Sequence, residues 1–277
     1  MRSNNPVLSK PDAWQSVNAN GQYAQYPGQQ APGQPYPGQQ YTGQPSDFGP
    51  PNQPVQAGRM TIDDVITKSA ITMGTLMAVA ALTFLFLPQA LLLPAAIVGA
   101  LVSFGVVLLV SFRRQINPAF VLAYAAIEGV FIGAISKVYE NLYDGIVPAA
   151  VLGTIVAAAT TLAAYKFFRI KVTNKFRRMV MIGTIAYAGV LFVNFILSLF
   201  GVNLLFGTGT SIGLLLLFSA IGVGLAVFNL ILDFDYIEQG IAMGADSSQS
   251  WRAAFGLTVT MVWLYIEILR LLSYFRR

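Results

Sequence analysis

Two apolar stretches near the C-terminus decide the fold: residues 211–232, SIGLLLLFSAIGVGLAVFNLIL, and residues 253–274, AAFGLTVTMVWLYIEILRLLSY. Each has the roughly 20 residues that an α-helix needs to cross a bilayer. Acidic side chains accompany both, because Asp233 and Asp235 follow the first stretch and Glu267 lies inside the second. A charged carboxylate at the centre of a membrane helix costs about 2.5–3.5 kcal/mol, which makes these acids candidates for a functional site.

The composition of the whole chain indicates a polytopic membrane protein. Of its 277 residues, 55% are hydrophobic and only 10% are charged, whereas a soluble domain has about 25% charged residues. The chain has no cysteine and no histidine, which excludes thiolate and histidine metal sites and the Ser-His and Cys-His catalytic arrangements. We therefore expect no enzyme activity and no cofactor, and the small net charge of +5 does not indicate nucleic-acid binding.

Seven apolar runs of membrane-spanning length predict the architecture of residues 58–277, an all-α bundle of seven transmembrane helices. Thr61, with Asp63 and Asp64 behind it, has the pattern of an N-cap and acidic first turn where the first helix begins. The predicted spans are 66–87, 91–112, 118–138, 146–168, 179–200, 211–233 and 253–274. Small residues at four-residue spacing indicate close helix packing or a mobile, pore-lining helix. These pairs are Gly99 with Ser103, Gly129 with Gly133, and Gly209 with Gly213.

Lysine and arginine gather in alternate connections between the runs. The clusters are Arg59 and Lys68, Arg113 and Arg114, and Lys166, Arg169, Lys171, Lys175, Arg177 and Arg178. Because positive loops stay in the cytoplasm, we expect the N-terminus and the connection between helices six and seven to be cytoplasmic. The C-terminus is then expected on the outer side of the cell (inner) membrane, although the positive charges of Arg276 and Arg277 do not fit the preference of Lys and Arg for the cytoplasmic side.

Residues 1–57 differ from the rest of the chain. YPGQQ occurs at residues 26–30 and again at 36–40, in a segment rich in Pro, Gly, Gln and Tyr. Such a composition cannot bury a core, so we predict a disordered cytoplasmic tail. It is either a solvated extension or a docking segment for a protein partner.

The acids of helices six and seven form the predicted site. Asp233 lies about 14 residues before the polar turn near residues 246–249 and Glu267 about 18 after it, so the two are expected at similar depth in a helical hairpin. Asp235 points about 200° away from Asp233 on a helix and is the alternative partner. Arg270, three residues after Glu267, is a competing ion-pair partner.

Two facing carboxylates in a low dielectric cannot easily both be ionised, so they share a proton over a range of pH. Raising the pH would remove that proton and favour a cation or separation of the helices. Glu128 lies about 15 Å along the third helix, near the midplane, as a further acid of the path or a neutral, hydrogen-bonded carboxylic acid. The pattern predicts a proton-sensitive cation path. If Arg270 neutralises Glu267 and the two aspartates lie at the membrane surface, the acids are only structural.

Three segments resemble the Bax inhibitor (transmembrane BAX inhibitor motif) family, in its bacterial form, over residues 60–277. They are Asn117-Pro118 with Glu128-Gly129 and Gly133, the segment LDFDYI at 232–237, and the segment LYIEIL at 264–269. The resemblance implies a bundle with a central seventh helix and a pH-sensitive calcium leak, in which a pair of aspartates on helices six and seven is the sensor. It assigns these roles to Asp233, which has Ile237 four positions later, and to Glu267, which stands where the family usually has aspartate. Calcium would be the transported ion, held between Asp233 and Glu267.

Other functions remain open at this point. A non-conducting scaffold or stress regulator would act through its tail and loops. A proton-coupled transporter would use the same acids, although no inverted repeat is evident. An intramembrane aspartyl protease lacks the Gly-x-Gly-Asp segment it would need.

Overall fold

The structure, a computed structural model, describes residues 58–113, 116–168, 170–202 and 209–276. Within these ranges it consists of seven long helices and a short 3-10 turn, η2 (Gln89–Leu91). The helices are α1 (Ile62–Phe86), α2 (Leu92–Phe112), α3 (Pro118–Leu142), α4 (Ile146–Phe167), α5 (Asn174–Leu199), α6 (Ile212–Ala242) and α7 (Gln249–Phe275). All seven are long and apolar enough to cross a membrane, which confirms the predicted fold class. The predicted tail, residues 1–57, lies outside the described residues.

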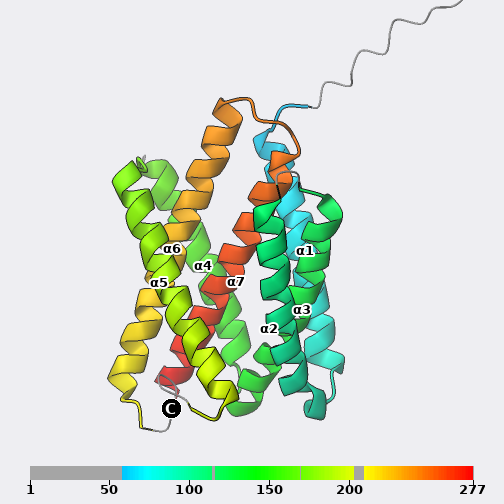
Figure 1. Cartoon of the computed structure of the whole chain (residues 1–277), viewed down its shortest axis with the longest axis vertical. Helices are drawn as coiled ribbons and strands as arrows, with labels where there is room; N and C mark the ends of the chain where they lie inside the picture. Colours follow the sequence, from blue (N-terminus) through cyan, green and yellow to red (C-terminus); the bar gives the residue numbers. More distant parts are fainter. Residues whose placement is uncertain (1–57, 114–115, 169, 203–208, 277) are drawn as a thin grey trace, which may run out of the picture. The chain divides into compact units, whose positions relative to one another are not determined.

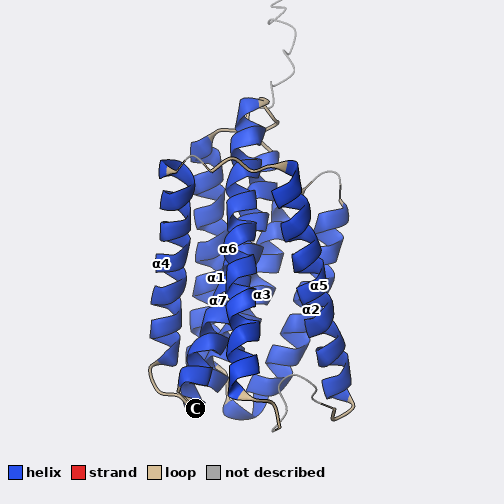
Figure 2. Ribbon diagram, turned by 90° about the vertical axis from the view of Figure 1, so that its left-hand side faces the viewer, coloured by secondary structure: helices blue, strands red, loops and turns tan. Residues whose placement is uncertain are grey.

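Helix α7 is the centre of the bundle. It packs against α1, α3, α4 and α6, and Figure 1 shows it crossing between α1–α3 on one side and α5–α6 on the other. In the perpendicular view, α4 lies at one edge and α2 and α5 lie at the other (Figure 2). The central seventh helix that the resemblance implied is therefore present.

Helix N-termini begin where the sequence supplies a capping side chain. Thr61, Asn117, Thr173 and Ser211 each accept a hydrogen bond from a backbone N–H in the first turn of α1, α3, α5 and α6. Such a cap satisfies one of the four donors that a helix leaves unpaired at its start. The predicted start of the first helix at Thr61 is confirmed.

The boundaries of the last two helices differ from the predicted spans. Helix α6 has 31 residues and continues to Ala242, beyond the predicted end at 233, and α7 begins at Gln249 instead of 253. The prediction followed hydropathy, which shows only where the apolar run ends. Helix α6 continues beyond that point as an amphipathic segment. Ile237 and Gly240 on that turn are buried, while Gln239 is exposed.

The chain before α1 is fastened to the α6–α7 turn by backbone bonds. Met60 N–H donates to Ala245 O at 2.7 Å, and Ser247 N–H donates to Gly58 O at 2.7 Å. A hydrogen bond from the Ser248 backbone N–H holds the pKa of the Asp246 carboxyl below its usual value. This end of the bundle, which we call the α6–α7 end, also carries the α2–α3 and α4–α5 connections (Figure 1).

Helices α1 and α3 approach closely at glycines. A Cβ on Gly129 would lie 2.7 Å from Leu76 O, and one on Gly133 would clash with Ala80 O. On α2, Gly99 faces Phe131 in the same way. These two predicted small-residue pairs therefore serve packing, whereas Gly209 and Gly213 have no neighbour within 4 Å for a Cβ among the described residues.

Replacing Gly129 with alanine should destabilise the bundle by about 1–3 kcal/mol, because the added methyl group overpacks the α1–α3 contact. Thermal unfolding of the purified protein in detergent measures the change. The matched control is Gly224→Ala in α6, where a Cβ meets nothing within 4 Å and helix propensity favours alanine by up to about 1 kcal/mol. Equal behaviour of the two variants would contradict the close packing.

Candidate functional site

Glu267 and Arg270 form a buried ion pair on α7. Arg270 Nη1 donates to Glu267 Oε1 at 2.9 Å and to Oε2 at 3.0 Å. The Glu267 side chain is 1% exposed and that of Arg270 is 16% exposed. Tyr187 from α5 and Trp263 from α7 are the nearest further polar neighbours of Glu267. Arg270, the competing partner proposed from the sequence, is therefore the residue that pairs with Glu267 in the structure.

A glycine on α6 makes room for this carboxylate. A Cβ on Gly222 would lie 2.8 Å from Glu267 Oε2, so a side chain at this position would have to displace the carboxylate. Glu267 thus faces α6 at the level of Gly222, which precedes Asp233 and Asp235 along that helix by about three turns or more.

Asp233 faces α7 at a different level. Its Oδ1 would lie 3.5 Å from a Cβ on Gly256, and the Thr260 side chain is a polar neighbour of the carboxyl. The other oxygen, Oδ2, is buried and accepts no hydrogen bond from any residue that the structure describes. A buried acceptor without a partner is costly, by about 1–3 kcal/mol, and is the kind of exception that calls for an explanation.

The predicted pairing of Asp233 with Glu267 is wrong in this structure. Asp233 lies opposite Gly256, and Glu267 follows Gly256 by eleven residues on α7, which is about 16 Å along a helix. The error lies in the register of the hairpin. The opposed pairs Asp233–Gly256 and Gly222–Glu267 are both symmetric about residues 244–245, whereas the prediction placed the turn near 246–249. The two acids therefore cannot hold one calcium ion together in this conformation.

Asp235 is not the alternative partner either. Arg177 of α5 donates to Asp235 Oδ2 at 2.8 Å, and Gln239 donates to the same oxygen at 2.7 Å. Asp235 thus faces α5 while Asp233 faces α7, as the predicted 200° separation requires. Asn229, one turn earlier on α6, donates to Thr184 of α5 at 2.7 Å.

A cavity of about 660 Å³ brings Glu128 together with the Glu267–Arg270 pair. Its walls come from α2, α3, α5 and α7, and include Ser103, Asn194 and Trp263. We call it the carboxylate cavity. Glu128 is 6% exposed, and Ser103 of α2 lines the same cavity, with its buried hydroxyl accepting or donating no hydrogen bond among the described residues. The sequence prediction used Ser103 only as a packing residue and did not name Asn194 or Trp263, for which the only signal was a polar atom inside an apolar run.

The acids of the cavity lie at two depths. The Tyr124 and Phe255 rings are 5.0 Å apart, and Ser136 Oγ lies 2.7 Å from the Tyr265 hydroxyl, which sets the parallel register of α3 and α7. In that register Glu128 lies near the level of Val259, and Glu267 lies about two turns, or ~12 Å, deeper from the α6–α7 end. Glu128 of α3 and Asp233 of α6 are therefore at similar depth beside α7.

α5, one wall of this cavity, is the least tightly packed helix. Among the described residues its backbone approaches α6 alone. Its other contacts are made by side chains, because Phe104 of α2 and Phe192 of α5, which both line the cavity, stack with ring centroids 5.9 Å apart. α5 also contacts α7 through side chains, because the rings of Tyr187 and Trp263 lie 5.9 Å apart.

A resident metal centre has no support in the described part of the chain. No three His, Cys, Asp or Glu side chains there lie close enough together to hold an ion. The acids are dispersed along α3, α6 and α7.

Comparison of the chain with known proteins identifies its family. A family model described as Bax inhibitor 1 like matches residues 5–277, and no curated protein matches the chain. The sequence motifs had indicated a resemblance over residues 60–277 only. The family match begins at residue 5 and is therefore wider. The N-terminal segment belongs to the matched region.

Proposed function

Because the chain belongs to the Bax inhibitor 1 like family, we propose that it is a pH-sensitive calcium leak pathway of the cell membrane, with a cytoplasmic N-terminus. Calcium enters the proposal from the family resemblance. Calcium and protons would be its ions and the lipid bilayer its surroundings. The pathway requires no catalytic step and no bound cofactor.

The observation that carries the proposal is the carboxylate cavity between α2, α3, α5 and α7. Glu128 and Glu267 both line it. In the described residues the side-chain ion pairs are Arg177–Asp235 and Arg270–Glu267, so Glu267 has a counter-charge while Glu128 and Asp233 have no such ion pair. A buried carboxylate without a counter-charge is stable only when it holds a proton or a cation.

This difference assigns the roles. Glu128, which lines the carboxylate cavity, and Asp233, which lies at similar depth but outside the lining of that cavity, each exchange a proton for a cation as the pH rises. Glu267 remains neutralised by Arg270 and forms the deeper end of the cavity. At low pH the two lone acids carry protons and attract no cation, so the leak is expected to increase with pH.

Calcium flux into liposomes that contain the full-length protein and a calcium dye tests the proposal between about pH 5 and pH 8. Wild-type flux should rise with pH. Glu128→Gln together with Asp233→Asn should lower it about tenfold or more at the upper pH, equal to about 1.4 kcal/mol in the barrier, and should remove the pH dependence. The control is Glu238→Gln, an acid on the projecting turn of α6 that accepts a hydrogen bond from Tyr165. Equal flux for wild type and the double variant at every pH would refute the proposal.

The same vesicles separate the rival functions. A scaffold or regulator that acts through residues 1–57 would give no flux in pure lipid, and its effect in cells would be lost on deletion of that segment. A proton-coupled transporter would move protons in fixed proportion to calcium, which a second, pH-sensitive dye detects.

A further inference from the structure

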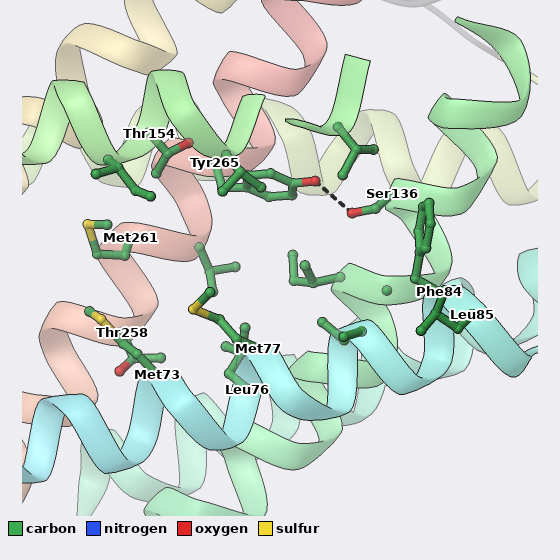
Figure 3. A pocket seen from close by; sticks show the side chains of 18 residues that line it. Met73, Leu76, Met77, Phe84, Leu85, Ser136, Thr154, Thr258, Met261 and Tyr265 are labelled. Atoms are coloured by element: carbon green, nitrogen blue, oxygen red, sulfur yellow. Dashed lines mark hydrogen bonds between the residues drawn. The ribbon is translucent and has the colours of Figure 1, made fainter. Parts of the chain in front are cut away.

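A second cavity, of about 420 Å³, lies between α1, α3, α4 and α7. Met73 and Met77 of α1 and Met261 of α7 line it, and we call it the methionine groove. Figure 3 shows Met73, Met77 and Leu85 along α1, with Thr154 of α4 on the opposite wall. It contains no acidic or basic side chain, unlike the carboxylate cavity.

The groove opens sideways between two helices. The backbones of α1 and α4 do not approach each other within the described residues. The floor is buried, with Leu76 at 7% and Thr258 at 1% exposed, whereas the rim residues Met77 and Ile155 are 60% and 54% exposed. Since α1 and α4 are both long and apolar enough to span a membrane, the opening faces the hydrocarbon core of the bilayer.

The walls offer nothing to water or to an ion. Thr154 and Thr258 donate their hydroxyls to backbone carbonyls one turn earlier, Ala150 O and Ala254 O. The remaining hydroxyls, of Ser136 and Tyr265, bond to each other at 2.7 Å (Figure 3). A cavity lined in this way stays dry and accepts apolar groups, and methionine side chains adapt to irregular apolar partners.

The length of the groove matches one leaflet of the membrane. On α1 its lining runs from Met73 to Leu85, twelve residues or ~18 Å, and half of a hydrocarbon core is about 15 Å. Leu85 and Val147 lie beside the ends of α1 and α4, at the end of the bundle opposite the α6–α7 turn. The groove therefore begins at one membrane surface and stops near the middle of the bilayer.

We propose that the methionine groove is a binding site for one acyl chain of a bilayer phospholipid, in the leaflet at the α3–α4 end of the bundle. The chain enters between α1 and α4 and lies on Leu76, Ile132 and Val262. Its headgroup stays at the surface beside Leu85 and Val147. This site is separate from the ion pathway and does not depend on it.

Photolabelling of the full-length protein in phosphatidylcholine vesicles tests the site, with a phosphatidylcholine that carries a diazirine in one acyl chain. Irradiation followed by peptide mapping should place most of the label on α1 and α4 residues of the groove. The comparison surface is the outer face of α5, where Met181 and Ile182 are 53% and 59% exposed. Excess unlabelled phospholipid should displace the photolabelled lipid slowly from the groove and immediately from the α5 surface.

Two matched tryptophan variants locate the label. Val151→Trp, on the groove wall and 37% exposed, should fill the site and lower groove labelling several-fold. Ile185→Trp, on α5 and 65% exposed, should leave it unchanged, and unaltered thermal unfolding of both variants shows that they fold. Labelling of the α5 face equal to that of the groove, or labelling insensitive to Val151→Trp, overturns the proposal. Groove residues protected from lipid in a cross-linked dimer overturn it as well, in favour of a second copy of the chain.

Discussion

Arg270→Gln is expected to destabilise the folded bundle by about 3–5 kcal/mol, which is the usual cost of removing one partner from a buried ion pair. The reason is that Glu267, 1% exposed, would lose the guanidinium that neutralises both of its oxygens. The change is measured as a shift in the SDS- or heat-induced unfolding of the purified protein in mixed micelles.

Two variants control this experiment. Glu267→Gln combined with Arg270→Gln removes the uncompensated charge and should recover most of the lost stability. Arg177→Gln breaks the pair with Asp235, in which the arginine side chain is 48% exposed, and should cost no more than about 1 kcal/mol. If both arginines proved equally costly, or the double variant recovered nothing, the burial of the Glu267–Arg270 pair would be disproved.

Disulfide cross-linking should give an all-or-none result for the α6–α7 register. The chain has no native cysteine, so a pair of introduced cysteines is the only pair that can react. Asp233→Cys with Gly256→Cys should form a disulfide readily, because a Cβ on Gly256 lies 3.5 Å from Asp233 Oδ1. Asp233→Cys with Glu267→Cys should not, because the two positions are about 16 Å apart along the helices, whereas disulfide formation needs Cα atoms within about 7 Å.

Mass shift after mild oxidation, checked by reversal with a reducing agent, reads out this experiment. A disulfide between positions 233 and 267 with none between 233 and 256 would restore the paired-acid arrangement predicted from the sequence.

Much of the fold was predictable because the signals are local. An apolar run of about 20 residues can be counted in the sequence without knowledge of its neighbours, and all seven predicted spans are helices. Thr61 capped the first helix as predicted because a cap depends on residues three positions apart. The end of α6 was placed too early, since polar residues after Asp235 end the apolar run but do not end a helix.

The sequence analysis named the individual acids of the candidate site, but it did not predict which residues lie next to each of them. Asp233, Asp235, Glu128 and Glu267 are all acids of membrane-spanning helices, and Arg270 pairs with Glu267 as its i,i+3 spacing allowed. That pair is local to one helix turn, so spacing could reveal it. The partner of Asp235 lies on another helix, 58 positions earlier in the chain, and no spacing rule reaches that far.

The sequence by itself determined that this chain is a seven-helix membrane protein with a few acids in its spans, because hydropathy and helical periodicity depend on neighbouring residues alone. Only the tertiary structure decided that Glu267 lies against Gly222, that Asp233 lies against Gly256, and that Glu128 shares a cavity with Glu267. The physical reason is register. A shift of a few residues in one turn moves a side chain by several ångströms along its helix, and that shift is set by how glycines and side chains of different helices pack together.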